Sequence, residues 1–251
     1  MTDGRDEVMP KQRRLWPTLL AGLILFCVLV GLGTWQMQRL SWKEGLIAAV
    51  DARIKEQPRS LAELEKQFVE TGDVDYWPVS AAGRFLNDRE SHFLATWQGR
   101  AGFFVYTPLA LPDGRYVLVN RGFVPFEQKD PATRPMGQVE GEVAVTGLAR
   151  NPLAGKPSSL VPDNDPAKNV FYWKDLGAMA ARSELPADRL VPFFIDADGK
   201  SNPGGLPIGG VTLVEFPNNH LQYAFTWYGL AAALAAVLGA WVVKRRRTGE
   251  G

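Results

Sequence analysis

The sequence predicts an α+β membrane protein in which two terminal transmembrane helices flank an antiparallel β-sheet or partly closed barrel with a few helices. Long uncharged apolar segments lie near both ends of the 251-residue chain, and strand-like segments separated by short turns fill the region between them. The composition, 46% hydrophobic and 22% charged, is that of a chain able to bury a core. A net charge of +1 gives no support for nucleic-acid binding.

The first apolar segment is expected to cross a membrane as a helix over residues 15–35. It forms most of a stretch of 24 uncharged residues between Arg14 and Arg39, and about 20 apolar helical residues span a hydrocarbon core of roughly 30 Å. Trp16 and Trp35 lie near its ends, where aromatic rings favour the headgroup layer. The segment is longer than the apolar region of a signal peptide and no Ala-x-Ala site follows it, so we expect an uncleaved anchor.

The second apolar segment is predicted to span the membrane over residues 223–243. It belongs to a stretch of 28 uncharged residues between Glu215 and Lys244, with Trp241 near its carboxyl end. Two helices buried in a soluble core are the alternative interpretation. The length of both segments favours membrane spans over that alternative.

Basic residues flank both predicted spans on their outer sides. Lys11, Arg13 and Arg14 precede the first span and Lys244–Arg247 follow the second, which indicates that both termini are cytoplasmic. The intervening region carries 20 basic and 23 acidic residues, consistent with translocation. The amino-terminal segment is too short and too acidic for a mitochondrial transit peptide, so we expect a bacterial inner membrane. The expected organisation is residues 1–14 cytoplasmic, 15–35 spanning, 36–222 a periplasmic α+β domain, 223–243 spanning and 244–251 cytoplasmic.

The region between the spans predicts helices at its start and middle and strands elsewhere. Apolar spacing indicates a helix from Lys43 to Phe68 that is broken at Pro58, with Ser60 and Glu63 forming a capping box for its second part. A further helix is suggested between Phe171 and Met179. Alternating segments bounded by turn residues predict strands at Val79–Leu86, Ser91–Trp97, Phe103–Leu111, Arg115–Val124, Glu142–Ala149, Leu190–Ala197 and Val211–Phe216.

The chain lacks the motifs of several enzyme classes. It has no phosphate-binding loop, no dinucleotide fingerprint after a strand and no nucleophile elbow. Its only cysteine, Cys27, lies inside the first span, and its only histidines are His92 and His220, so one chain cannot build a zinc or copper site from Cys and His clusters. We therefore expect a protein that is not an enzyme. A membrane-anchored periplasmic enzyme is an alternative, which would need perturbed acids or bases in a pocket of the domain.

His220 lies where the second span is expected to emerge from the membrane. Asn218 or Asn219 could cap the helix, and positions 220, 223, 224 and 227 share one helical face. A neutral imidazole beside Tyr223 and Trp227 is a competent axial ligand for haem iron, with the rings bordering a flat apolar macrocycle. In the alternative, His220 and the asparagines only tie the helix end to the domain.

Two further segments carry candidate residues. In Leu32–Lys43, Trp35, Arg39 and Trp42 fall on one side of a continuing helix, so Arg39 could contact an anionic group such as a haem propionate. An aromatic belt with a basic anchor explains the same residues. In Val119–Pro125, a bend or bulge would present Asn120 and Arg121, for which a structural hydrogen-bonding role is favoured.

Together these segments resemble the Surfeit locus protein 1 family, assembly factors of haem–copper cytochrome c oxidases. The matching stretches are LGTWQMQRLSWK near the first span, VNRGFVP in the sheet and NNHLQYAFTWYG entering the second span. The resemblance implies a role in maturing the catalytic subunit of the oxidase around insertion of haem a. It also implies that His220 occupies the position of a histidine connected with haem a binding in bacterial members.

The resulting hypothesis is an inner-membrane assembly factor of respiratory-chain biogenesis that holds haem a, or the oxidase subunit awaiting it. His220 is the expected iron ligand, Trp35, Tyr223 and Trp227 the apolar wall, and Arg39 the anionic contact. A second axial ligand would come from His92, from a partner, or not at all. Expected partners are the oxidase catalytic subunit, haem a synthesis enzymes and membrane lipids. A protein-only chaperone is the alternative, using the small residues Ala232, Ala236 and Ala240 of the second span.

Overall fold

The computed structural model describes residues 15–247 apart from 213 and 215, and it consists of two compact units. One unit comprises Met1–Ala48 and Glu215–Gly251, and the other comprises Ala49–Val214. We refer to them as the helix pair and the sheet domain. The basic residues Lys11, Arg13 and Arg14, on which the predicted orientation partly depends, lie outside the described residues.

The helix pair consists of α1 (Leu15–Ile54), whose last residues enter the sheet domain, and α4 (His220–Arg247), and both are long and apolar enough to cross a membrane. Only 11% and 6% of the most apolar 18-residue segments of α1 and α4 are buried inside the protein. The alternative of two buried core helices is therefore wrong. At 1.5 Å per residue, the 40 residues of α1 extend about 60 Å, twice the hydrocarbon thickness. The predicted first span and the first predicted helix of the following region are therefore one continuous helix.

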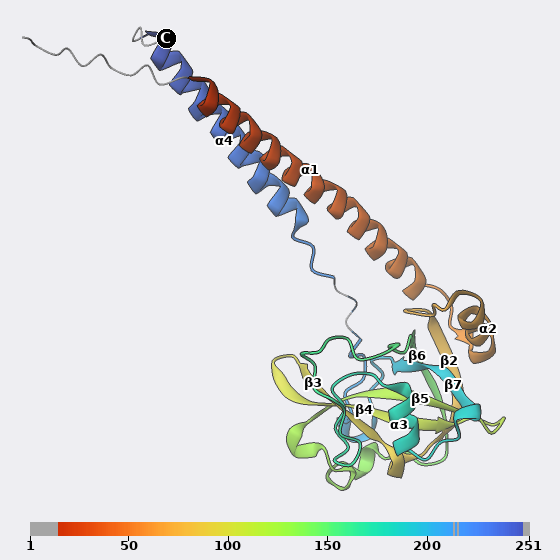
Figure 1. The fold of residues 1–251 in the computed structure, drawn as a ribbon. Helices are drawn as coiled ribbons and strands as arrows, with labels where there is room; N and C mark the ends of the chain where they lie inside the picture. The colour runs from red at the N-terminus through yellow and green to blue at the C-terminus, as the bar shows by residue number, and fades with distance from the viewer. Residues whose placement is uncertain (1–14, 213, 215, 248–251) are drawn as a thin grey trace, which may run out of the picture. The chain divides into compact units, whose positions relative to one another are not determined.

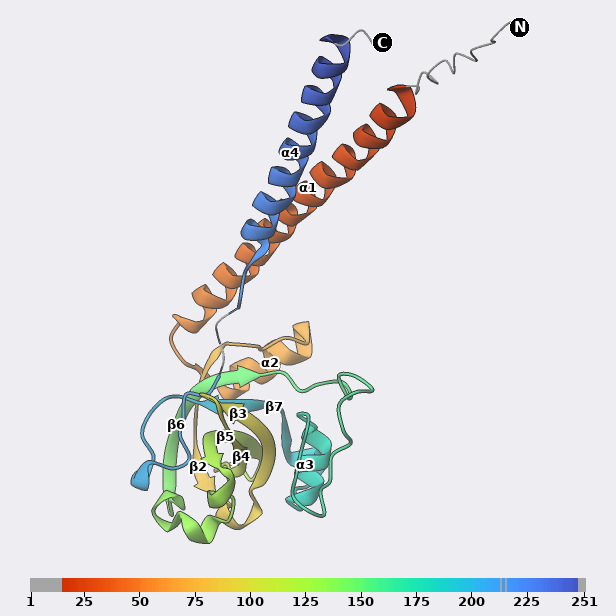
Figure 2. The same ribbon diagram turned by 90° about the vertical axis from the view of Figure 1, so that its left-hand side faces the viewer.

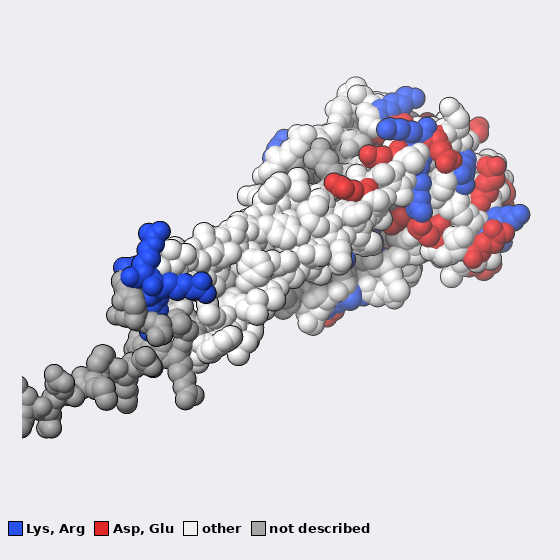
Figure 3. All heavy atoms as spheres, turned by 90° about the horizontal axis from the view of Figure 1, so that it is seen from above, with Lys and Arg blue, Asp and Glu red and all other residues white. Residues whose placement is uncertain are grey.

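The surface of the helix pair reflects the apolar composition of its two helices. Charged side chains are sparse along the helices, and basic ones gather in the last turn of α4, which contains Lys244–Arg247 (Figure 3). Acidic and basic side chains both cover the sheet domain (Figure 3). A large part of the helix surface thus suits lipid, whereas that of the domain suits water.

The capping box predicted before the second helix is confirmed. After the break near Pro58, a short strand β1 (Arg59–Ser60) leads into α2 (Leu61–Thr71). The Ser60 hydroxyl accepts a hydrogen bond from the Glu63 amide at 3.4 Å, and the Glu63 carboxylate accepts one from the Ser60 amide at 2.8 Å. Gly72 ends the helix in the left-handed conformation, with φ of 69°.

Seven strands form a partly closed barrel in the sheet domain, as predicted (Figure 1). Their order is β1-β2-β6-β7-β5-β4-β3, and an additional pairing between β2 and β4 closes a ring of five strands. At this closure Gly83 lies so close to the Ala110 carbonyl that a Cβ would overlap with it, so only glycine fits. The other bounds are β2 (Pro78–Phe85), β3 (Ser91–Trp97), β4 (Arg100–Ala110), β5 (Tyr116–Pro125), β6 (Glu142–Arg150) and β7 (Leu190–Ala197).

The sheet is mixed rather than wholly antiparallel. Consecutive strands β3, β4 and β5 form the predicted hairpins, but β5 pairs with β7 in parallel and β2 does not pair with β3. The predicted strand Val211–Phe216 is wrong for its described residues, which are not in a strand. Both edges of the preceding strand β7 are occupied by β5 and β6, so the following segment has no free edge there.

Alternating side chains of the strands supply two main hydrophobic cores. On β7, Val191, Phe193 and Ile195 enter the larger core, which Leu64 of α2 covers, while Phe194 points to the opposite side. There it packs with residues of α3 (Leu176–Arg182), which lies beside the sheet (Figure 2). This helix begins later than predicted, because Phe171 forms a β-bridge with β3 and Asp175 caps the helix.

Candidate functional site

The two long helices pack antiparallel to each other. Leu238 near the end of α4 packs on Gly22 near the start of α1, whereas Tyr228 packs on Gly33, further along α1. The Tyr228 hydroxyl also lies 3.1 Å from the Thr34 hydroxyl, within hydrogen-bond distance. This arrangement brings the start of α4 beside the middle of α1.

His220 is held at this junction by a glutamine of the other helix. It is the first residue of α4, and its side chain is half-buried, with Nδ1 2.8 Å from Oε1 of Gln36. Because an amide oxygen accepts hydrogen bonds, Nδ1 is the donor in this contact, and in the neutral imidazole Nε2 then keeps its lone pair. The structure therefore brings together the two helix segments that the sequence predicts as one site.

A backbone hydrogen bond stabilises the start of α4, and the described residues provide no side-chain cap there. The Tyr223 amide donates to the carbonyl of Asn219 at 3.2 Å. The side-chain oxygen of Asn218 is buried and accepts no hydrogen bond from the described residues. Lys43 of α1 donates to the carbonyl of Pro217, which connects the segment before α4 to α1.

The other predicted site residues form an open surface. Trp35 and Tyr223 expose 53% and 55% of their surface, and Trp227 is half-buried. Arg39 is exposed and its guanidinium lies 4.1 Å from the centre of the Trp42 ring, so these two share one side of α1 as predicted. The aromatic residues therefore do not enclose the imidazole.

A cavity that the sequence interpretation missed is lined by residues that follow His220 in α4 and by one residue of α1. Its volume is about 360 Å³, and it is lined by Met37, Leu221, Ala224, Phe225 and Tyr228. The four residues of α4 have the i, i+3, i+4, i+7 spacing of one helix face. That spacing could have indicated an apolar face on α4. It could not have identified Met37 of α1, which forms the opposite wall of the cavity.

His92 belongs to a buried polar cluster inside the sheet domain. Its side chain is 4% exposed, with Nε2 3.2 Å from a Glu90 carboxylate oxygen and Nδ1 2.7 Å from the amide nitrogen of Asn169. Glu90 also forms a buried ion pair with Arg134. Both ring nitrogens of His92 already have partners, so the structure gives no support to His92 as a second axial ligand.

The predicted bulge in Val119–Pro125 occurs inside β5. Two residues, Arg121 and Gly122, stand opposite one residue of β4, and Gly122 adopts φ of 122°. Asn120 donates to Asp196 at 3.0 Å, and Arg121 donates to the Gly137 carbonyl at 2.5 Å. The favoured structural role of Asn120 and Arg121 agrees with these contacts.

Comparison with known proteins places this architecture in one family. The model of the SURF1 family matches residues 23–232. Surfeit locus protein 1 of Rattus norvegicus is 41% identical over 219 residues, covering 81% of this chain and 68% of the relative. The human protein of the same name is 38% identical, with 87% and 74% covered, and a SURF1-like protein of Monosiga brevicollis is 38% identical, with 94% and 88% covered. Since both the family model and these relatives extend over most of its length, the chain belongs to the SURF1 family.

Proposed function

We propose that this protein is a membrane-anchored assembly factor for haem–copper cytochrome c oxidase that acts in delivering haem a to the catalytic subunit and is not itself an enzyme. The single observation that carries the haem part is the contact between His220 and Gln36. The family membership supports the wider role, through the resemblance in the three motifs.

The hydrogen bond between His220 and Gln36 suits a histidine that coordinates iron. A metal-binding histidine usually donates its second ring N–H to an oxygen acceptor, which fixes the tautomer and orients the ring. Gln36 provides such an acceptor at 2.8 Å, and in the neutral ring this contact would leave the lone pair of Nε2 available to a ligand. Bound haem a would supply an iron centre that accepts this lone pair.

The surroundings of His220 suit part of a flat apolar ligand. The neighbouring cavity of about 360 Å³ is at the lower end of ligand pockets, which hold about 300–1,000 Å³. Exposed Trp35, Tyr223 and Trp227 would extend this surface, and Arg39 would contact a propionate. A tetrapyrrole would be only partly covered, which suits a protein that passes its ligand to the oxidase subunit or receives it from synthesis enzymes.

The proposed location is a bacterial inner membrane, with both termini cytoplasmic and the sheet domain periplasmic. Antiparallel packing of α1 and α4 supports termini on the same side. The basic last turn of α4 supports a cytoplasmic assignment for that side (Figure 3).

Haem content of the purified protein tests the haem proposal. The protein is expressed with haem a synthesis enzymes, purified in mild detergent and analysed by absorption spectroscopy. His220→Ala is expected to lose the haem, and Gln36→Leu to weaken its binding by about 10–100-fold, as other partners of ligating histidines do. Gln36→Glu keeps an acceptor and should retain haem. Gln38→Leu, at an exposed position of the same helix, is the matched control.

Equal haem in the wild type and in His220→Ala would remove His220 from the proposal. The second candidate function, a protein-only chaperone, would then be favoured. It draws support from the exposed small residues Ala232, Ala236 and Ala240, which form a face of α4 able to pack closely against another helix. In that case Ala236→Leu should weaken co-purification of the oxidase subunit more than His220→Ala does.

A further inference from the structure

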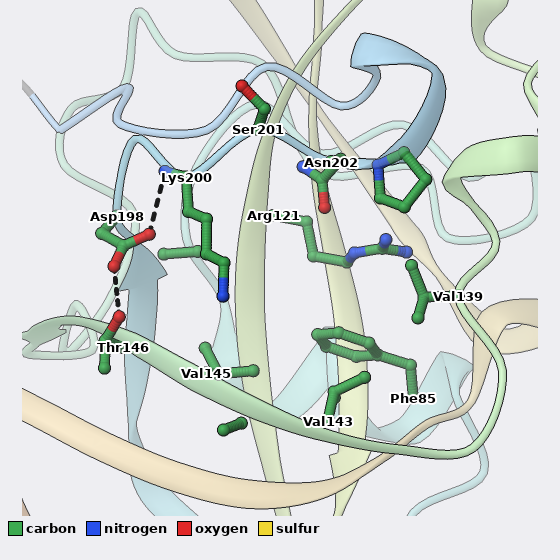
Figure 4. A pocket seen from close by; sticks show the side chains of 13 residues that line it. Phe85, Arg121, Val139, Val143, Val145, Thr146, Asp198, Lys200, Ser201 and Asn202 are labelled. Atoms are coloured by element: carbon green, nitrogen blue, oxygen red, sulfur yellow. Dashed lines mark hydrogen bonds between the residues drawn. The ribbon is translucent and has the colours of Figure 1, made fainter.

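A second cavity lies wholly within the sheet domain, apart from the helix pair. Its volume is about 280 Å³. Apolar side chains from the end of β2 and from β6 line it, namely Phe85, Val143 and Val145 (Figure 4). Arg121 of β5 and Lys200, in the segment after β7, bring two positive charges to the same cavity. An apolar lining combined with a few polar groups is typical of small-molecule sites.

Arg121 is a buried charge that forms no direct ion pair with a carboxylate among the described residues. The residue is 2% exposed, and its guanidinium donates to the Gly137 carbonyl at 2.5 Å and to Asn87 Oδ1 at 3.2 Å. Its Nε is buried and has no hydrogen-bond partner within the described part of the chain. Burial lowers the pKa of Arg121 to about 10, although the charge of Glu90 opposes this. A buried cation of this kind is costly unless an anion compensates it.

Lys200 and Asp198 set the net charge of the cavity. Asp198 accepts hydrogen bonds from the Lys200 amide, at 3.0 Å, and from the Thr146 hydroxyl. The Lys200 side chain extends toward Val145, while the Arg121 guanidinium lies over the ring of Phe85, 4.5 Å from its centre (Figure 4). Two cations and one carboxylate leave the lining with a single positive charge, which favours a monoanion over a phosphate dianion.

We propose that this cavity binds a small amphiphilic monocarboxylate, with its carboxylate between Arg121 and Lys200 and its hydrocarbon part on Phe85, Val143 and Val145. At about 30 Å³ for each water-sized group, the cavity accommodates roughly nine heavy atoms. A medium-chain fatty acid such as octanoate is close to this size and matches this chemistry. The site is independent of the haem proposal, because its residues belong to the sheet domain alone.

Equilibrium dialysis of radiolabelled octanoate against the full-length protein in lipid nanodiscs tests the site. Empty nanodiscs measure partitioning into lipid, and the protein is expected to add saturable binding. Lys200→Met keeps the length of an exposed side chain but removes its charge, and should weaken binding by about tenfold or more, as expected for a hydrogen bond to a charged group. Lys66→Met, at an exposed lysine of α2 outside the cavity, should bind as the wild type does.

Competition experiments test the two halves of the proposed ligand. Unlabelled octanoate should displace the label, whereas 1-octanol and inorganic sulfate should do so at least tenfold more weakly. Equal displacement by 1-octanol would show that charge is irrelevant, and equal displacement by sulfate would show an unspecific anion site. Either result overturns the proposal, as does unchanged binding by Lys200→Met when its thermal unfolding midpoint equals that of the wild type.

Discussion

Replacing Gly33 by valine should separate the helix pair, because Tyr228 occupies the space that a side chain would need. A Cβ at this position would lie 2.7 Å from Cε1 of Tyr228 and 2.9 Å from Cδ1 and Cζ of the same ring. The ring must therefore move, which also removes its contact with the Thr34 hydroxyl at 3.1 Å. Overpacking of this kind costs about 1–3 kcal/mol, and a value of about 2 kcal/mol lowers the association of the helices about thirtyfold.

Gly31 provides a matched control for this prediction. It lies two residues earlier in α1, and a Cβ there would have no neighbour within 4 Å. Gly31→Val therefore has the same intrinsic effect on helix formation without the collision. Both variants are titrated with SDS in mixed micelles, and spin labels on Cys27 and on an introduced Ala233→Cys report the distance between the helices. If α1 and α4 separate at the same SDS fraction in Gly33→Val and in Gly31→Val, the contact between Gly33 and Tyr228 does not control their association.

Three further predictions concern the sheet domain of the full-length protein. Ser60→Ala should lower the free energy of unfolding by about 1 kcal/mol through loss of the α2 cap, as measured by urea unfolding, and an unchanged value would contradict the observed capping box. Gly122→Ala should impair folding far more than Gly99→Ala, because a Cβ at Gly122 would overlap with the Ile208 carbonyl, whereas a Cβ at Gly99 would meet open space. Similar yields of folded protein from the two variants would disprove this. Burial alone would raise the pKa of Asp73, but hydrogen bonds from the Asp75 amide, Asn151 and Arg53 together lower it. Asp73 therefore stabilises the protein above its unfolded pKa of about 3.8 and loses this contribution as the pH falls through its lower folded value, so Asp73→Asn should make the unfolding temperature less dependent on pH below about pH 4.

The sequence described each helix that carries the proposed site, but it did not describe the contacts between the two helices. Helical periodicity placed Arg39 and Trp42 on one side of α1, which their stacking confirms. Periodicity also grouped His220 with Tyr223 and Trp227, but the partner of the imidazole is Gln36, 184 positions away in the chain. A sequence pattern describes one helix at a time, whereas the rotation of two helices about their axes depends on which side chains pack between them.

The amino-acid sequence by itself determined the elements with strong local signals. Long uncharged apolar segments specify the two helices that are able to span a membrane. The strands Ser91–Trp97 and Leu190–Ala197 have the predicted bounds, because alternating side-chain polarity and turn residues delimit them. Only the tertiary structure decided the parallel pairing of β5 with β7, the closure of the barrel at Gly83 and the cavity beside Arg121. These features depend on backbone and charge partners far apart in the chain, which become neighbours only when the barrel closes.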